Sequence, residues 1–235
     1  MLKVKVADFI IDIQNKYRYL EKQCSDYIYD GDEPADFTVS VTQEEMDIEA
    51  KEYDVDFHPA LLESTCAYRQ IAMELPQRGA LLMHGATFAI DGKGIIFIAR
   101  SGVGKSTHTM LWQKLYGDKL TIVNGDKPII RFFDGVPYAY GTPWAGKEKL
   151  QTNTRVQLTD ICILERGLEN STVKVDPADY LDQIMQQVLR PADHLTALKT
   201  LELVDILSNK CSFWNIKCNI SDDAAICSHD AIFCE

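Results

Sequence analysis

The feature that most limits the fold of this chain is a glycine-containing string near its middle, Ala99-Arg100-Ser101-Gly102-Val103-Gly104-Lys105-Ser106. An apolar run over residues 94–98 precedes it, and a helical pattern over residues 105–116 follows it and ends at Gly117. A buried strand that turns through glycines into a helix needs other strands beside it. The string therefore predicts an α/β fold with a sheet next to this turn.

The spacing within the string is A-x-x-x-x-G-K-S, the pattern of phosphate-binding loops. Glycines let successive backbone N–H groups point at phosphate oxygens, and the following helix N-terminus adds positive partial charge. In such a loop Lys105 contacts the β- and γ-phosphates, and the Ser106 hydroxyl ligates Mg²⁺. We therefore expect ATP, or another nucleoside triphosphate, and Mg²⁺ as cofactors. The expected nucleotide-binding residues are Ser101, Gly102, Val103, Gly104, Lys105, Ser106 and Thr107.

Short apolar runs separated by glycine continue through the second part of the chain and are typical of strands buried on both faces. The expected strands cover residues 80–84, 87–90, 94–99, 120–123, 129–133, 161–164 and 213–218. Besides the helix over residues 105–116, we expect helices over 177–189 and 193–207.

The first part of the chain has a different texture. Alternation predicts one strand over residues 2–13 and others over 27–29 and 37–41. The acidic stretch 47–56 has little pattern, and a helix is expected over 59–75. We interpret residues 1–76 as a β-rich extension packed on a nucleotide-binding domain of residues 77–235.

Charge and hydropathy restrict the possible partners. The 235 residues include 24 Lys and Arg against 35 Asp and Glu, a net charge of −11. A nucleic-acid partner is not expected, because phosphate neutralisation needs clustered cations. No apolar run approaches the ~20 residues of a membrane span, so we expect no membrane partner and a cytoplasmic location.

A loop of this kind needs a carboxylate at the end of a nearby strand, to hold the metal or to accept a proton. Asp126 follows the run 120–123, and Glu165 follows the run 161–164. Asp126 is favoured, because Gly125 before it allows a close backbone approach to a ligand. Glu165 is followed by Arg166 and is interpreted as part of an ordinary surface ion pair.

The order of these motifs resembles the HPr kinase/phosphorylase catalytic domain and its relative phosphoenolpyruvate carboxykinase. The resemblance rests on His84-Gly85, Gly92-Lys93-Gly94, the glycine string and Val123-Asn124-Gly125-Asp126, and covers about residues 80–170. More closely, residues 124–128 and 140–148 look like a bacterial subgroup of HPr-kinase-like proteins related to the kinases of peptide-modification cassettes. The resemblance implies a mixed sheet around the phosphate-binding loop.

The resemblance also implies roles for individual residues. It puts His84 beside the transferred phosphate, with a core histidine as the alternative, whereas His108 is expected on the surface. In the loop over residues 141–148, Lys147 would neutralise developing charge and Trp144 would line the acceptor pocket, unless the indole belongs to the core. Thr142 and Glu148 of this loop are expected to contact the substrate.

These features together predict a kinase that transfers the γ-phosphoryl group to a hydroxyl, in a serine of a protein or peptide or in a small molecule. Lys105, Asp126, His84 and Lys147 are the expected catalytic residues, and Ser106 and Asp126 the expected metal ligands. One departure from the HPr kinases is that Gly125 replaces the first of two consecutive aspartates. The alternatives are a carboxykinase-like enzyme and a non-catalytic nucleotide-binding regulator. The resemblance also allows a homo-oligomer.

Overall fold

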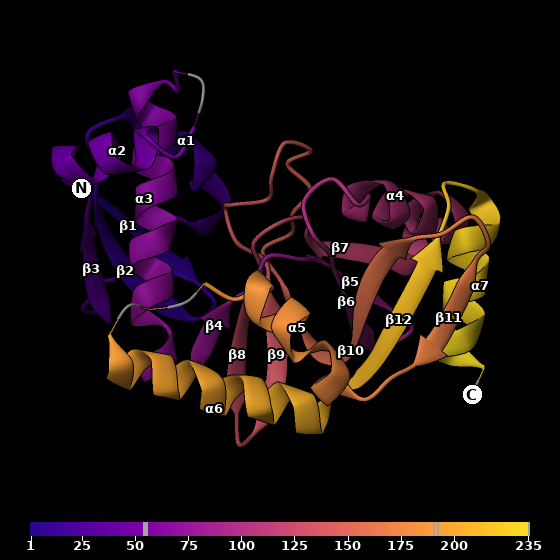
Figure 1. Ribbon diagram of the computed structural model, residues 1–235. Coiled ribbons are helices and arrows are strands. Elements are labelled where there is room, and N and C mark those ends of the chain that lie inside the picture. The colour runs from indigo at the N-terminus through magenta and orange to yellow at the C-terminus, as the bar shows by residue number, and fades with distance from the viewer. Residues whose placement is uncertain (54–55, 190, 192, 235) are drawn as a thin grey trace.

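The computed structural model describes residues 1–53, 56–189, 191 and 193–234. This part of the chain is a mixed α/β fold with seven α-helices, one sheet of three strands and one curled mixed sheet of nine (Figure 1). The α/β class predicted from the sequence is thereby confirmed.

The smaller sheet and three helices form the N-terminal part. In chain order they are β1 (Leu2–Val6), β2 (Phe9–Gln14), α1 (Arg18–Gln23), β3 (Phe37–Ser40), α2 (Gln43–Ala50) and α3 (Pro59–Glu74). With as many helices as strands, this part is an α/β layer and not the β-rich layer expected. Its hydrophobic core continues into the larger sheet through Leu82, Ile129 and Tyr140, so the two parts pack together.

Two local predictions for this part were wrong. Residues 2–13 form a hairpin instead of one strand, because Ala7 and Asp8 adopt left-handed φ angles of 51° and 60° and turn the chain without a glycine. Of residues 27–29, Tyr27 ends a 3₁₀ helix and Ile28 makes an isolated bridge. The first residues of the acidic stretch 47–56 belong to α2. Part of this stretch lies outside the described residues.

The larger sheet holds the strands of the second part. They are β4 (Ala80–Leu82), β5 (Ala86–Ile90), β6 (Lys93–Ile98), β7 (Leu120–Asn124), β8 (Ile129–Phe133), β9 (Val136–Tyr140), β10 (Arg155–Arg166), β11 (Ser171–Lys174) and β12 (Ser212–Cys218). The order is β4-β8-β9-β10-β6-β5-β7, with β12 beside β10 and β11 beside β12. The long strand β10 curls the sheet, because its first residues pair with β9 and its later residues with β6 and β12.

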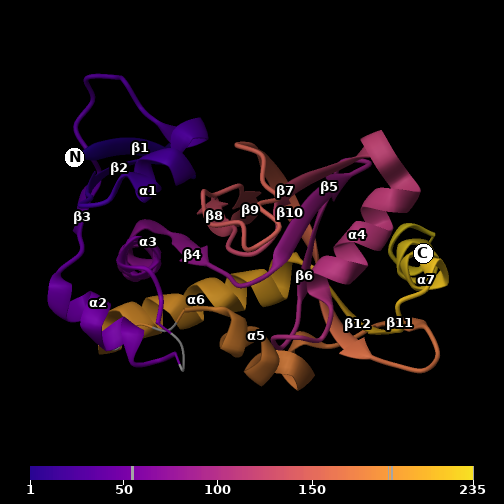
Figure 2. The same ribbon diagram turned by 90° about the horizontal axis from the view of Figure 1, so that it is seen from above.

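Helices cover both faces of the β6–β10 region (Figure 2). Ile96 and Ile98 pack with α5 (Leu181–Gln187) and α6 (His194–Lys210), whereas Ile95 and Phe97 pack with α4 (Lys105–Tyr116) and α7 (Asp222–Phe233). The alternation confirms that β6 is buried on both faces. The helix expected over 177–189 is divided into a 3₁₀ turn, Pro177–Tyr180, and α5. Among the described residues, no helix is both long and apolar enough to cross a membrane.

Candidate functional site

Strand directions bring three parts of the chain to one edge of the larger sheet. β5 is antiparallel to both β6 and β7. The start of β5 therefore lies beside the ends of β6 and β7. His84 precedes β5, Lys105 begins the helix after β6, and Asp126 follows β7. Asp126 was expected at the end of a nearby strand, and that strand is β7, which β5 separates from β6.

The turn between β6 and α4, residues 99–106, is called the glycine loop here. Gly102 and Gly104 have φ angles of +79° and +124°, which favour glycine over any residue with a side chain. Arg166 at the end of β10 donates a hydrogen bond to the Gly102 carbonyl oxygen at 2.6 Å. The parallel pairing of β10 with β6 places Arg166 there. The prediction that Arg166 forms an ordinary surface ion pair with Glu165 was therefore wrong.

A group of four polar side chains, called the carboxylate cluster here, lies at the end of the glycine loop. The His84 Nε2 atom is 3.1 Å from Lys105 Nζ and 3.2 Å from Asp126 Oδ1. Lys127 Nζ lies 3.0 Å from Asp126 Oδ2. His84, Lys105 and Asp126 were predicted as site residues from the sequence. Lys127 was missed, although it directly follows Asp126.

The electrostatics of the cluster favour an ionised carboxylate. Burial acts to raise the pKa of Asp126, but the hydrogen bond from His84 and the charge of Lys127 outweigh it and bring the pKa down to about 2. Burial lowers the pKa of Lys105, with Lys127 adding to this effect and Asp126 opposing it. Asp126 is therefore negatively charged at neutral pH.

Asn124 fixes the turn that carries Asp126. Its buried Oδ1 atom accepts hydrogen bonds from the backbone N–H groups of Asp126 and Lys127, at 2.9 and 2.6 Å. Its Nδ2 atom donates to the Thr142 carbonyl oxygen at 3.0 Å, and the Thr142 hydroxyl donates to the Lys127 carbonyl oxygen at 2.7 Å. Thr142 was expected to contact substrate, but its hydroxyl is fully buried and supports this turn.

Gly125, which precedes the single carboxylate of this turn, is closely packed. Its N–H donates to the Leu150 carbonyl oxygen at 2.8 Å. A Cβ at this position would lie 3.3 Å from the carbonyl oxygens of Ala145 and Leu150. An aspartate here, as in the HPr kinases, would need these segments to shift.

The other predicted site residues of the 141–148 loop differ in their burial. The Trp144 side chain is buried, and its indole N–H donates to the Ser64 hydroxyl of α3 at 3.1 Å. Trp144 thus belongs to the core, the alternative that the sequence left open, while also lining a cavity described below. Lys147 and Glu148 are exposed. The contacts given above among His84, Lys105, Asp126 and Lys127 do not involve either of them.

Two further sequence-based assignments concern His108 and Glu165. His108 was expected at the surface, but it is buried, 3.2 Å from the Ser228 hydroxyl of α7, and burial lowers its pKa to about 4. Glu165 lies near the end of β10, and burial together with the charges of Glu165 and Asp179 raises the pKa of Tyr180.

Two cavities adjoin these elements. One of about 270 Å³, called the α3 pocket here, has Asp126 and Lys127 in its wall together with side chains of α1 and α3. Another, of about 400 Å³, is lined by the glycine loop, Arg166 and residues 218–220. The two cavities are lined by different elements. Each is large enough for part of a small ligand.

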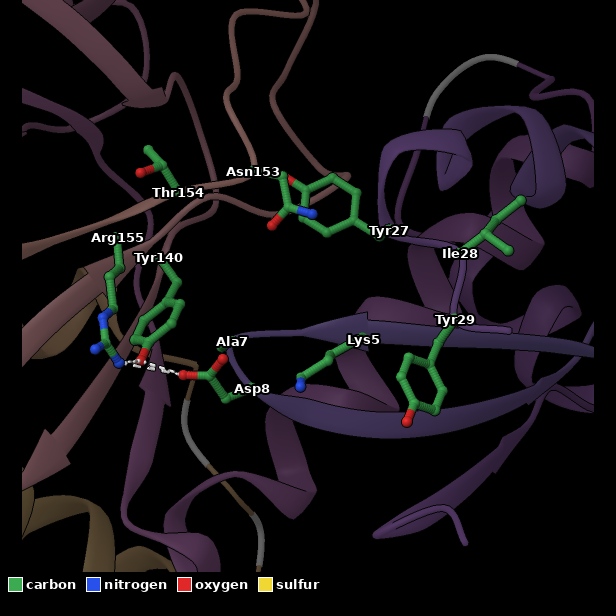
Figure 3. A pocket seen from close by; sticks show the side chains of 10 residues that line it. All are labelled: Lys5, Ala7, Asp8, Tyr27, Ile28, Tyr29, Tyr140, Asn153, Thr154 and Arg155. Carbon is green, nitrogen blue, oxygen red and sulfur yellow. Dashed lines mark hydrogen bonds and ion pairs between the residues drawn. The ribbon is translucent and has the colours of Figure 1, made fainter. Parts of the chain in front are cut away.

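A third hollow, of about 460 Å³, lies between the β1–β2 turn and strands β9 and β10 (Figure 3). Figure 3 shows Asp8, Tyr140 and Arg155 directed toward one another. The Tyr140 hydroxyl donates to Asp8 at 2.6 Å, and Arg155 forms an ion pair with Asp8 at 3.4 Å. Arg155 thus forms a surface ion pair that joins the two parts of the molecule.

Comparisons with known proteins add little to this geometry. No protein-family model matches the chain, and no curated protein matches it. Among solved structures, the HPr(Ser) kinase/phosphatase from Coxiella burnetii is a weak match, with a TM-score of 0.32 and 14% sequence identity. The alignment covers 53% of this chain and 93% of that one. A likeness of this strength does not assign the chain to a family.

Proposed function

We propose that this chain is a nucleotide-dependent kinase that transfers the γ-phosphoryl group of ATP, or of another nucleoside triphosphate, to a hydroxyl. The supporting observation is that Lys105, His84 and an ionised Asp126 converge at the end of a glycine loop that opens a helix. Backbone N–H groups and a lysine suit phosphates, and an adjacent carboxylate suits metal binding.

The residues present fit a magnesium nucleotide. The half-exposed Ser106 hydroxyl and the ionised Asp126 are oxygen donors of the kind Mg²⁺ prefers, and they would hold the ion. When bound, Mg²⁺ neutralises charge on the phosphates. The N–H groups of residues 102–107 and the Lys105 ammonium would orient the nucleotide.

The remaining chemistry is placement of the acceptor and removal of its proton. A carboxylate whose pKa is about 2 holds a proton weakly, so Asp126 is suited to metal binding more than to proton acceptance. We assign proton acceptance to the unprotonated ring nitrogen of His84, because the Nε2–H group donates to Asp126 Oδ1. Lys127 would stabilise negative charge on the transferred group.

A second candidate function is a nucleotide-binding regulator without turnover. The observation that favours it is the single carboxylate at the turn, where Gly125 packs against the Ala145 and Leu150 carbonyls. Measuring phosphoryl transfer separates it from the kinase.

Lys105→Ala tests the nucleotide site. We expect at least a tenfold loss of Mg-ATP affinity by calorimetry and loss of transfer to a pool of serine-containing peptides, because Lys105 is the cation at the end of the glycine loop. The matched control is Lys114→Ala on the same helix, whose exposed ammonium pairs with Asp222. Equal affinities in all three proteins would refute nucleotide binding by this loop. Tight binding without transfer would favour the regulator.

A further inference from the structure

The α3 pocket connects the N-terminal part of the chain with the carboxylate cluster. Tyr19 of α1 and Leu61 and Tyr68 of α3 line it on one side, and Asp126 and Lys127 on the other. No motif of the sequence gives Tyr19, Leu61 or Tyr68 a function. The pocket therefore links a segment without an assigned role to the centre of the proposed chemistry.

Large apolar side chains are exposed around this pocket. Tyr19, Tyr53, Phe57 and Leu61 all line it, and each is 37–38% exposed. The Tyr53 and Phe57 rings pack edge to face, with centroids 4.5 Å apart. Exposed apolar side chains that gather around a hollow mark a binding site more than a structural surface.

The inner end of the pocket is polar and charged. Lys127 Nζ lies 5.9 Å from the centre of the Tyr68 ring and 3.0 Å from Asp126. Asp126 in turn contacts His84, which contacts Lys105. A molecule in the pocket would thus place its apolar portion against α3 and its polar end beside the residues assigned to phosphoryl transfer.

The volume limits the size of the apolar portion. A protein cavity of about 150 Å³ is enough to bind benzene. At about 270 Å³, the α3 pocket holds one ring or branched apolar side chain together with the few atoms that link it to a hydroxyl. It does not hold several such side chains.

We propose that the α3 pocket selects the phosphoryl acceptor, and that the acceptor carries one bulky apolar or aromatic group next to its hydroxyl. The inference rests on the proposed kinase function and adds the acceptor class to it. A serine or threonine beside a large apolar residue in a peptide has this chemistry, and so does a small aromatic alcohol.

The experiment compares matched acceptors with the full chain and Mg-ATP. The peptide probes are acetyl-Phe-Ser-Phe-amide and acetyl-Ala-Ser-Ala-amide, and the small probes are 2-phenylethanol and ethanol. Binding is measured by calorimetry and transfer by mass spectrometry. We expect the aromatic member of at least one pair to bind and react about tenfold better or more, the gain typical of burying a phenyl ring. The responding pair identifies the source of the acceptor.

Two variants of exposed residues test the location. Leu61→Glu puts a carboxylate in the pocket wall and Phe57→Ala removes a ring, so we expect both to abolish the aromatic preference while nucleotide affinity is unchanged. Ile48→Glu on α2 is the matched control, because Ile48 is exposed and is not among the residues that line the pocket. A preference retained in both pocket variants overturns the proposal.

The remaining outcomes separate the inference from the function on which it rests. Equal transfer to aromatic and alanine probes overturns the inference and leaves the kinase intact. Binding of aromatic probes without transfer, at saturating Mg-ATP, overturns the kinase and leaves the α3 pocket as a binding site. Absence of binding and transfer with all four probes overturns the inference.

Discussion

Replacing Asp126 with asparagine keeps the shape of the side chain and removes the charge on which the cluster depends. We expect Mg-nucleotide binding to persist, because the glycine loop and Lys105 are unchanged. Phosphoryl transfer is expected to fall by at least about 10²-fold, the size of effect seen when one charge-stabilising group is removed from an active site, because Asp126 is a proposed ligand of Mg²⁺. Transfer near the wild-type rate in Asp126→Asn, together with its loss in Glu165→Gln, would show that the wrong strand was chosen.

The same substitution has a consequence for stability that follows from the pKa. A lowering from 3.8 to about 2 means that the folded state favours the ionised form. At ~1.36 kcal/mol per pKa unit, this preference is worth about 2 kcal/mol. Because the folded-state pKa is depressed, the contribution is complete above the unfolded-state pKa and is lost as the pH falls from about 4 toward 2.

Urea unfolding measures this contribution to the free energy of unfolding. Wild type and Asp126→Asn are compared from pH 5.5 down to the lowest pH at which both fold. We expect the asparagine variant to be less stable by about 2 kcal/mol at pH 5.5. The difference should shrink as the solution becomes more acidic. Asp118→Asn, at an exposed aspartate in the turn after α4, is the control and should change stability little. A difference that stays constant on acidification would refute the ionic account of the cluster.

Three other substitutions test the supports of the site. Arg166→Ala removes the guanidinium that donates a hydrogen bond to the Gly102 carbonyl oxygen of the glycine loop. Mg-ATP affinity, measured by calorimetry, should fall about tenfold, the value of one charge-assisted hydrogen bond. Unchanged affinity would show that the loop keeps its shape without Arg166. Trp144→Phe loses the bond to Ser64 and should lower the free energy of unfolding by about 1 kcal/mol, measured by chemical denaturation. Ser228→Ala leaves the buried Trp112 N–H without its partner, and chemical denaturation should show a loss of about 1–3 kcal/mol.

The elements that the sequence predicted well are those specified by short-range pattern. Helix α4 spans residues 105–116 as expected, because the glycine turn sets its start and Gly117 its end. The buried strands β5, β6 and β7 were found within one or two residues, since strands covered on both faces need nearly continuous apolar residues. Lys105 and Asp126 were predicted from the positions of these strands, whereas His84 was predicted from the resemblance to the HPr kinases.

Other elements were missed because their signals are weaker or depend on distant contacts. Helix α2 has a capping box between Thr42 and Glu45, a local signal that the acidic composition obscured. The turn at Ala7 and Asp8 uses left-handed residues without glycine, so the alternating pattern runs through it unbroken. The length of β10 depends on pairing with three different strands, which no local pattern encodes.

The side chains around the carboxylate cluster also depend on contacts with residues that are distant in the sequence. Lys127 contacts Asp126 because Asn124 turns the backbone there, and Asn124 is held by Thr142, 18 residues further along the chain. His108 is buried because α7, more than a hundred residues away, packs against α4 through Ser228. Neither contact follows from helical or strand periodicity, so exposure and partners could not be predicted at these positions.

The N-terminal part reaches the site through one short loop. Under the proposed function, acceptor choice and phosphoryl transfer would therefore be separate properties of one chain. Trp144 bonds to Ser64 of α3, and Thr142, two residues earlier, supports the turn that carries Asp126. The same short loop therefore fixes α3 relative to the carboxylate. Nucleotide binding is assigned to the glycine loop, whereas the apolar wall of the α3 pocket comes from the N-terminal part. Changes to the exposed residues of that wall should alter which hydroxyl is accepted, while the bonds around Asp126 keep the geometry to which we assign phosphoryl transfer.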